Sequence, residues 1–523
     1  MEQPTNPISS EARMQALSPP GFRWQLTALF VLIVIVHLVT YAPGHSWGDD
    51  FAMYIMEGQS LVEGRSMMET GYVPNPHNPD IGPVAYPPVL PAILAPVIAI
   101  RGVDIAALKL VGVVLSLLLV VLAYATFSPY LGWCGRLAFL AVVGLNPFIL
   151  ELKTSINSDI PFAAFVFASI LLMDRAYRTV DGEQTPKSYL LLLAGVAMYL
   201  AYGTRNIGIV LPAVLLANDV IQRGWPRNGL FRGIVPSPAA MSACAIFAVG
   251  YFAQKYYLDN EGSYVDLVKF DPFLPVKNLG FYTQRLAGFF NNGYSKPAAA
   301  VLFAGLSVLA LIGLWRHLRQ GIRSFDLLVP AYMAPLLIWP THLSVPRYIL
   351  PLVPVFMFYM IRGALSVQVF GSFASRRILI GVVLLLVGLS YGFRLYAFGF
   401  EAPEQGIHRP ATQELFAFIR ENTAAENRVV FTKPRALALF TGRKALVYSD
   451  VDTPEANEEL YDSLGVRWLI VPANEEVFAE TGIPEQQARY SNWINRHQSW
   501  LQKVYTNDDF IVYRWLSKAE RGG

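Results

Sequence analysis

The sequence predicts a polytopic α-helical membrane protein that ends in a separate α/β domain. Of its 523 residues, 54% are hydrophobic and 15% are charged, whereas soluble domains carry about 25% charged residues. Apolar runs close to the roughly 20 residues that cross a bilayer recur before residue 400. Charged residues number 32 in the last 123 positions, against 47 in the first 400. We therefore expect a membrane body over residues 1–400 and a soluble domain over 401–523.

Composition also narrows the function. A net charge of +3 is too small to indicate binding of nucleic acid. Both cysteines, Cys134 and Cys244, lie in apolar runs, so no disulfide framework is expected. No metal-ligand spacing, glycine-rich phosphate loop or nucleophile motif stands out, so no cofactor is predicted. A divalent metal stays open, because two acids and a bound phosphate can recruit one.

Eleven apolar runs are expected to cross the membrane. One further run, Val84–Ile100, carries four prolines, which remove backbone donors and break a regular helix. We therefore expect it to be re-entrant or interfacial within external loop helices over 42–103. The eleven runs are 24–41, 104–124, 135–152, 159–175, 188–202, 206–220, 235–253, 298–315, 326–340, 347–363 and 377–397.

The distribution of basic residues sets the expected orientation. With a cytoplasmic N-terminus and no crossing at 84–100, the inside loops hold 15 Lys or Arg residues. The short outside loops hold only Lys153, Arg205 and Arg347. Because loops rich in Lys and Arg stay in the cytoplasm, the first loop and the C-terminal domain are predicted to lie outside.

The first outside loop opens with two adjacent carboxylates, Asp49 and Asp50. Phe51, Ile55 and Val62 follow at helical spacing, which predicts an amphipathic helix on the membrane surface with the aspartates at its N-terminal cap. Helix capping alone would account for either aspartate. Two neighbouring carboxylates at a membrane boundary also fit a catalytic site.

A second predicted outside acid, Asp159, begins another span in Ser158-Asp159-Ile-Pro161. N-capping and a functional role are compatible for it. Arg205 and Arg347 lie at the outer ends of spans, where they either anchor the helix end or bind a phosphate. Three residues on the same side are weaker candidates: Lys153, His342 and Arg285.

These residues resemble a known family, the C-type membrane glycosyltransferases. The group includes the dolichyl-phosphate-mannose protein mannosyltransferases and the bacterial aminoarabinose transferases. Within the C-terminal domain, 431–444 and 464–471 resemble the external α/β domain of bacterial members. The segments of the body that carry the resemblance are Gly48-Asp49-Asp50-Phe-Ala-Met-Tyr54, Tyr86-Pro87-Pro88, Ser158-Asp159-Ile-Pro161 and Arg347-Tyr348.

The resemblance implies an inverting transfer of a sugar from a polyprenyl-phosphate donor to a protein, lipid or glycan acceptor. The reaction would occur on the extracytoplasmic face, as in a bacterial inner membrane. The first-loop acid would act as the base and Asp159 would assist. The spacing to Tyr54 favours Asp50, whereas the position at the end of the span favours Asp49, so both stay candidates. The predicted substrate-binding residues are Tyr54, Tyr86, Lys153, Arg205, Arg285, His342 and Arg347.

A transporter or flippase of lipid-linked substrates is the alternative, since many spans and a proline-broken segment fit it as well. Two observations favour the transferase: the ionisable residues gather at the outer boundary, and the two halves show no internal repeat.

The C-terminal domain alternates predicted strands (429–431, 445–448, 468–471) with predicted helices (412–421, 484–497). It shows no catalytic constellation, and its expected role is acceptor binding or a lid.

Overall fold

The structure is a computed structural model that divides into two compact units. The helical unit comprises residues 1–41, 111–257 and 263–400, and the α/β unit comprises 42–110, 258–262 and 401–523. The predicted boundary near residue 400 thus ends the helical unit, while the first loop belongs with the C-terminal segment. The described residues are 20–78, 82–178, 186–223, 235–258, 271–290, 292–340, 346–367, 373–403, 406–448, 454–473, 477, 493–516 and 520.

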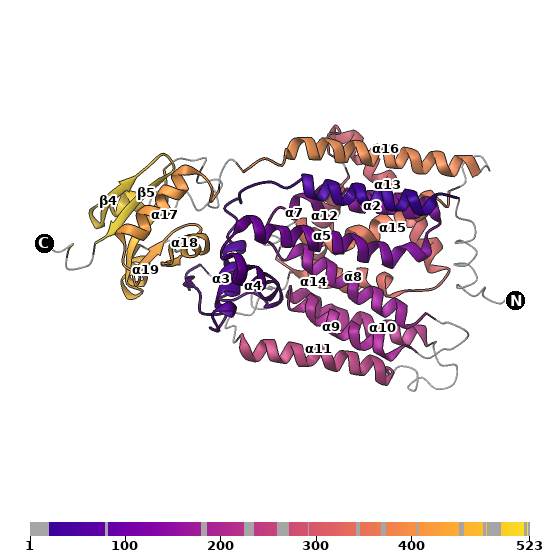
Figure 1. The fold of residues 1–523 in the computed structure, drawn as a ribbon, viewed down its shortest axis with the longest axis horizontal. Helices are drawn as coiled ribbons and strands as arrows, with labels where there is room; N and C mark the ends of the chain where they lie inside the picture. Colours follow the sequence, from indigo (N-terminus) through magenta and orange to yellow (C-terminus); the bar gives the residue numbers. More distant parts are fainter. Residues whose placement is uncertain are drawn as a thin grey trace. The chain divides into compact units, whose positions relative to one another are not determined.

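Each of the eleven predicted runs overlaps a helix in the helical unit (Figure 1). The helices of this unit are α2 (Phe22–Val39), most of α5 (Ile105–Phe127), α6 (Trp133–Gly144), α7 (Pro147–Leu152), α8 (Asp159–Ala176), α9 (Ser188–Tyr202), α10 (Leu211–Gln222), α11 (Pro238–Tyr257), α12 (Leu274–Gly288), α13 (Lys296–Leu318), α14 (Ser324–Ile338), α15 (Val353–Ala364) and α16 (Phe373–Phe398). Of these, α12 lies outside the predicted runs, in the predicted outer loop. Short 3₁₀ helices are η2 (Ser128–Tyr130), η3 (Asn206–Val210) and η6 (Pro346–Leu352).

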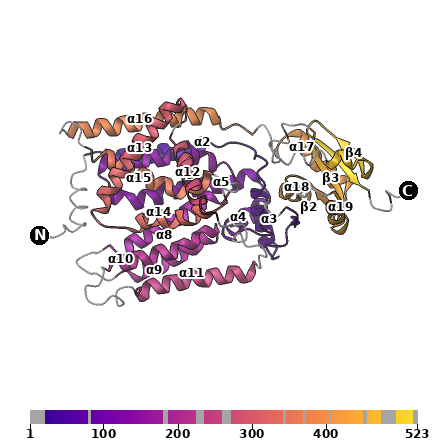
Figure 2. The same ribbon diagram turned by 180° about the vertical axis from the view of Figure 1, so that it is seen from behind.

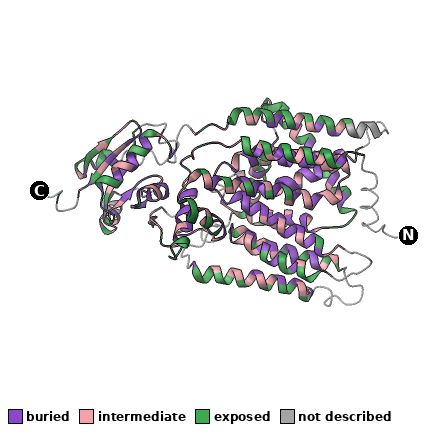
Figure 3. Ribbon diagram, in the orientation of Figure 1, coloured by how far each residue is buried: buried purple, intermediate pink, exposed green. Residues whose placement is uncertain are grey.

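Several of these helices are built to cross a membrane. Within the described residues, five helical stretches are long and apolar enough: Phe22–Val39, Ile105–Tyr130, Trp133–Leu152, Lys296–Leu318 and Ile378–Phe398. Large apolar side chains are exposed along α11, α13 and α16. Most residues of α8 are buried, and the ribbon coloured by burial shows α11 and α16 as largely exposed (Figure 3). Apolar surface of this extent requires a nonpolar solvent, so the chain is an integral membrane protein.

Small residues let the central helices approach closely. A Cβ atom on Gly313 of α13 would lie 1.9 Å from the carbonyl oxygen of Tyr359 in α15. A Cβ on Gly363 of α15 would lie 1.8 Å from the carbonyl of Leu309. Because lipid supplies no hydrophobic force between helices, such close packing holds a membrane bundle together.

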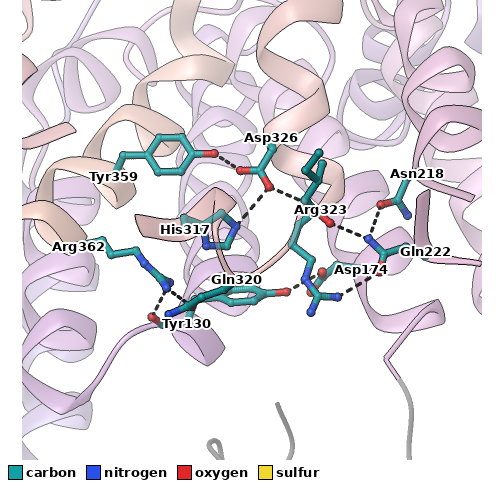
Figure 4. Close-up of polar contacts among 11 residues, drawn as sticks. Tyr130, Asp174, Asn218, Gln222, His317, Gln320, Arg323, Asp326, Tyr359 and Arg362 are labelled. Atoms are coloured by element: carbon teal, nitrogen blue, oxygen red, sulfur yellow. Dashed lines mark hydrogen bonds and ion pairs between the residues drawn. The ribbon is translucent and has the colours of Figure 1, made fainter. Parts of the chain in front are cut away.

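A polar cluster joins the helices at the C-terminal end of α8 (Figure 4). Asp326 accepts the backbone N–H of Arg323 at 2.6 Å and also the hydroxyl proton of Tyr359. The Tyr130 hydroxyl donates to Asp174 at 2.7 Å. These contacts connect η2, α8, α14 and α15, and they satisfy carboxylates that would be costly to bury alone.

The α/β unit contains a mixed five-stranded sheet in the order β2-β1-β3-β5-β4 (Figure 2). β1 pairs in parallel with β2 and β3, and β5 pairs antiparallel with β3 and β4. Its strands are β1 (Arg428–Val430), β2 (Lys444–Leu446), β3 (Val466–Pro472), β4 (Leu501–Thr506) and β5 (Phe510–Trp515). Its helices are α3 (Asp50–Val62), α4 (Val89–Arg101), α17 (Pro410–Asn422), α18 (Pro434–Thr441) and α19 (Pro454–Ser463), with η7 at Gln498–Trp500. Most of the predicted helix at 484–497 lies outside the described residues.

The first loop is bound to the edge of this sheet. Tyr72 forms a parallel bridge with Ala445 of β2, and the Asn75 amide donates to the carbonyl of Val447 at 2.9 Å. On the other side of the loop, Trp47 is buried against the rings of Phe431 and Phe510. Residues far apart in the chain therefore share one core.

The surroundings of α3 correct the expectation of a membrane-surface helix. Its residues Phe51–Gly58 are all buried, and Glu57, an acid in this predicted amphipathic helix, is completely enclosed. Gly58 allows α4 to approach, because a Cβ there would lie 3.3 Å from the carbonyl of Pro91. The helix is thus a core element of the α/β unit.

The proline-rich run forms a regular helix over Val89–Arg101, although its prolines were expected to break one; its re-entrant or interfacial placement stays a prediction. Pro88 occupies its N-cap and Pro91 its first turn. Backbone N–H groups in these positions have no partner within the helix, so proline costs little there. Pro96 is the one proline in the helix interior.

Candidate functional site

Tyr86 connects the acids of the first loop. Asp50, Tyr54 and Glu57 are spaced by four and three residues, which places them on one face of α3. The Tyr86 hydroxyl donates to Asp50 Oδ1 at 2.7 Å, and its backbone N–H donates to Glu57 Oε1 at 2.6 Å. Its ring lies 4.8 Å from that of Tyr54, measured between centroids. The structure thus brings together three of the predicted site residues, Asp50, Tyr54 and Tyr86.

Asp49 has a different role from the predicted cap. It occupies the N-cap position of α3, but its side chain makes no capping hydrogen bond to that helix. Instead, Asp49 Oδ1 accepts the backbone N–H groups of Arg435 and Ala436 at 3.1 and 3.2 Å. These groups begin α18, where unpaired donors and the helix dipole favour an anion. Asp49 therefore attaches the first loop to the C-terminal segment.

Arg435 provides the positive charge for both aspartates. Its side chain is fully buried, with Nε 3.8 Å from Asp49 Oδ2 and Nη1 3.6 Å from Asp50 Oδ1. Nη1 also donates to the Tyr86 hydroxyl at 2.8 Å. Its guanidinium carbon lies 4.6 Å from the ring centroid of Tyr72 and 5.0 Å from that of Tyr86. Contacts of this kind stabilise a desolvated cation. We call Asp49, Asp50, Tyr54, Glu57, Tyr72, Tyr86 and Arg435 the first-loop cluster.

Burial changes the proton affinity of two acids in this cluster. Desolvation raises the pKa of Asp49, although Arg435 and Lys433 oppose the rise. Desolvation also raises the pKa of Glu57 well above its usual range, against the hydrogen bond from Tyr86 and the charge of Arg435. The side chain of Asp50 is 39% exposed, compared with 12% for Asp49. Asp50 is therefore the more accessible carboxylate of the pair.

In the helical unit, Asp159 lies between two arginines. Arg205 Nη1 donates to Asp159 Oδ1 at 2.5 Å, and Arg347 Nε lies 3.4 Å from Oδ2. Arg205 also stacks over the ring of Tyr348 at 4.8 Å. Asp159 is the first residue of α8 and is buried, whereas the arginines are 19% and 35% exposed. We call Asp159, Arg205, Arg347 and Tyr348 the Asp159 cluster. Along the axis of α8, Asp159 lies about 22 Å from Asp174, which is near the other end of the helix.

The remaining predicted residues have other surroundings. Lys153 is buried, and its ammonium group donates to the carbonyl of Thr40 at 2.6 Å, which joins the ends of α7 and α2. Arg285 is exposed on α12 and stacks on Phe281 of the same helix. His342 lies outside the described residues. Among the residues that the structure describes, no group of three or more His, Cys, Asp or Glu side chains is arranged to hold a metal ion.

Sequence reasoning missed Arg435 and the burial of Glu57. The segment around Arg435 was selected for its resemblance to an external domain, and Pro434 marks the start of a helix there. Nothing in the spacing connects this arginine to an aspartate 386 positions earlier. The sequence of the C-terminal domain shows no catalytic constellation, whereas the structure places Arg435 of that segment beside the first-loop aspartates.

Comparison with known proteins is informative at the level of fold. Residues 85–252 match the family described as dolichyl-phosphate-mannose-protein mannosyltransferase. None of the curated proteins compared matches the chain. ArnT from Cupriavidus metallidurans, solved with undecaprenyl phosphate, is 12% identical with a TM-score of 0.53, and the match covers 94% of this chain and 98% of that one.

Two further structures are similar. The archaeal oligosaccharyltransferase AglB from Archaeoglobus fulgidus, solved with an inhibitory peptide and a dolichol-phosphate, is 12% identical with a TM-score of 0.58, covering 95% of this chain and 74% of that one. The arabinofuranosyltransferase AftD from Mycobacteria is 12% identical with a TM-score of 0.51, covering 96% of this chain and 42% of that one. These matches bear out the resemblance to the C-type membrane glycosyltransferases, and they show that the chain has the fold of ArnT, AglB and AftD.

Proposed function

We propose that this protein is an inverting glycosyltransferase that moves a sugar from a polyprenyl-phosphate donor to an acceptor hydroxyl at the extracytoplasmic membrane face. The new bond joins the acceptor oxygen to the anomeric carbon of the sugar. The bond from that carbon to the phosphate oxygen breaks, and polyprenyl phosphate leaves with the electron pair. The fold and the match over residues 85–252 support this class of reaction.

Asp50 is the proposed general base, and its exposed carboxylate carries this assignment. A base must reach the acceptor proton within about 2.6–3.2 Å, which requires an exposed carboxylate. Asp49 is less exposed, and its Oδ1 already accepts two backbone N–H groups. Asp50 accepts a hydrogen bond from the Tyr86 hydroxyl, which favours the ionised form that a base needs.

Arg205 and Arg347 are the proposed binding residues for the donor phosphate. Each guanidinium is partly exposed, and both are oriented by the single carboxylate of Asp159. Planar guanidinium groups bind phosphate through paired hydrogen bonds, and two of them would stabilise the charge that develops on the leaving phosphate. In this proposal Asp159 assists by holding both arginines. The outward orientation of the two acids and of the C-terminal domain stays a prediction.

The decisive experiment measures release of free undecaprenyl phosphate from undecaprenyl-phosphate-linked hexoses and pentoses by the purified full-length protein. A transferase releases the lipid phosphate when an acceptor is present, whereas a flippase moves the donor intact. Membrane extracts supply protein, lipid and glycan acceptors. Movement of intact donor across vesicles, with no release from any donor and acceptor pair, would overturn the proposal.

The assignment of the base is tested by Asp50→Asn beside Asp49→Asn. We expect Asp50→Asn to lower transfer about 10²–10⁴-fold, the usual contribution of a general base, with a melting temperature close to that of the unaltered protein. We expect Asp49→Asn to lower the melting temperature and reduce transfer less. The opposite ranking of the two activities would assign the base to Asp49.

A further inference from the structure

We infer that Arg435, on the C-terminal segment, is a positioning residue for the first-loop base: its side chain orients Asp50 through the Tyr86 hydroxyl and supports the start of α3 through a charge pair with Asp49. This inference rests on the proposed function of Asp50. It gives the C-terminal segment a defined part in the reaction, in place of the acceptor-binding or lid role expected from its sequence.

The burial of Arg435 is the first observation that carries the inference. Arginine is almost never fully buried unless it is paired, and an unpaired buried charge is strongly destabilising. Among the described residues, the charged and titratable groups around this guanidinium and its partner Asp49 are Asp49, Asp50, Glu57, Tyr72, Tyr86 and Lys433. All except Lys433 belong to the first loop, so the buried cation is matched to that loop.

The direction of the hydrogen bonds is the second observation. A guanidinium donates only, so Nη1 must donate to the oxygen of the Tyr86 hydroxyl. The Tyr86 proton is then directed to Asp50 Oδ1, 2.7 Å away. The chain Arg435–Tyr86–Asp50 therefore orients one carboxylate oxygen and favours its ionised form, while the carboxylate remains partly exposed.

The close fit around the guanidinium is the third observation. Nη2 donates to the carbonyl of Pro83 at 3.3 Å. The neighbouring Gly82 has φ of +117°, and a Cβ on it would lie 2.8 Å from Nη2. Backbone on this side and the rings of Tyr72 and Tyr86 therefore enclose the group. A lysine keeps the charge but cannot form the same set of directed contacts.

The test compares Arg435→Gln and Arg435→Lys with Arg443→Gln in the full-length protein. Arg443 is a matched control, because its guanidinium also binds the same unit, through Thr423 and the carbonyl of Arg420. We expect Arg435→Gln to lower kcat at least tenfold with little change in KM for the undecaprenyl-phosphate sugar. The acid limb of its pH profile should move to higher pH, because Asp50 loses an oriented hydrogen bond and a nearby cation. In Arg435→Lys, the acid limb of the pH profile should lie between that of Arg435→Gln and that of the unaltered protein.

A second readout does not depend on transfer. Hydrogen exchange at the start of α3 and around Tyr86 should be faster in Arg435→Gln than in Arg443→Gln. If Arg435→Gln does not fold, Tyr86→Phe interrupts the same chain of hydrogen bonds, and we expect the same shift of the pH limb. A kcat, pH profile and exchange pattern in Arg435→Gln equal to those of Arg443→Gln would overturn the inference. Absence of transfer in the unaltered protein would contradict the proposed function, and exchange would still decide whether Arg435 anchors α3.

Discussion

The Asp159 cluster and the first-loop cluster both combine carboxylates with arginine, yet they place the cation differently. Arg205 and Arg347 remain 19% and 35% exposed beside one buried carboxylate. Arg435 is fully buried, and one of the two carboxylates it faces is 39% exposed. In the Asp159 cluster the cations are accessible, whereas in the first-loop cluster an acid is accessible.

Under the proposed function, this difference predicts which group of each cluster would meet the substrate. A partly exposed guanidinium can exchange or share its carboxylate partner with an anion from solution. The guanidinium of Arg435 is enclosed by Tyr72, Tyr86 and Pro83, so it can act only through its neighbours. The accessible cations suit an anionic phosphate, and the accessible acid suits the transfer of a proton.

Among the variants that test this comparison, Asp159→Asn is expected to have the largest effect on transfer. The amide keeps the shape but removes the charge that orients both arginines, so we expect transfer to fall about 100-fold. We expect a loss of stability of about 2 kcal/mol, between the values for exposed and buried pairs. Transfer assays and thermal unfolding measure the two effects. Asp271→Asn is the control, since Asp271 pairs with an exposed lysine in the same unit. Equal transfer in both variants would contradict a role for Asp159.

A smaller effect is expected for the arginines taken separately. Arg347→Ala should weaken binding of undecaprenyl phosphate about tenfold, which corresponds to about 1.4 kcal/mol. Its melting temperature should change little, because this side chain is the more exposed. Arg205→Ala should weaken binding and also lower the melting temperature, since Arg205 contacts Ser158, Asp159 and Tyr348. Titration with the lipid phosphate, followed by thermal shift, separates the two outcomes. If both variants bind undecaprenyl phosphate as tightly as the unaltered protein, the two arginines are not its phosphate-binding residues.

The comparison also separates what sequence could predict from what it could not. Asp159, Arg205 and Arg347 each lie at the end of an apolar run, so the count of runs predicted that they lie on one side. The hydropathy pattern was therefore sufficient to predict that these three residues lie on the same side. The strands β1, β2 and β3 likewise overlap the predicted ranges, because short continuous apolar runs mark them.

The partners of the first-loop acids leave no such signal. Arg435 lies in a short helix, and no periodicity distinguishes a buried arginine from an exposed one. Glu57 follows the apolar residues of α3 and would face solvent on an isolated helix. Here α4 and the segment around Tyr86 enclose it. Tertiary packing between distant segments decides both positions, and a local pattern cannot report it.

The burial of Glu57 predicts that the stability of the protein depends on pH, and this effect should be smaller than the effects on transfer and binding above. Its pKa is raised from the usual 4.5 in the folded protein by desolvation. Its contribution to stability is therefore complete below about pH 4.5 and is lost as pH rises through the folded value. Glutamine resembles the protonated form, so Glu57→Gln should become more stable than the unaltered protein at higher pH. Melting temperatures from pH 5 to 9 test this, with the exposed Glu63→Gln as control. If the melting temperatures of the unaltered protein and of both variants change with pH in the same way, this prediction is wrong.

The smallest effect is expected for Arg285→Ala, which tests the limit of prediction from charge alone. Arg285 was a candidate because it is a cation in a predicted outer loop. Its guanidinium instead stacks on Phe281 of its own helix, 4.7 Å from the ring centroid, on an exposed surface. Exposed substitutions of this kind usually change stability by less than about 0.5 kcal/mol. We expect transfer and affinity for undecaprenyl phosphate to change less than twofold. A loss as large as that of Arg347→Ala would show that α12 supplies a third phosphate ligand, and that contact with Asp159 is not what marks the binding arginines.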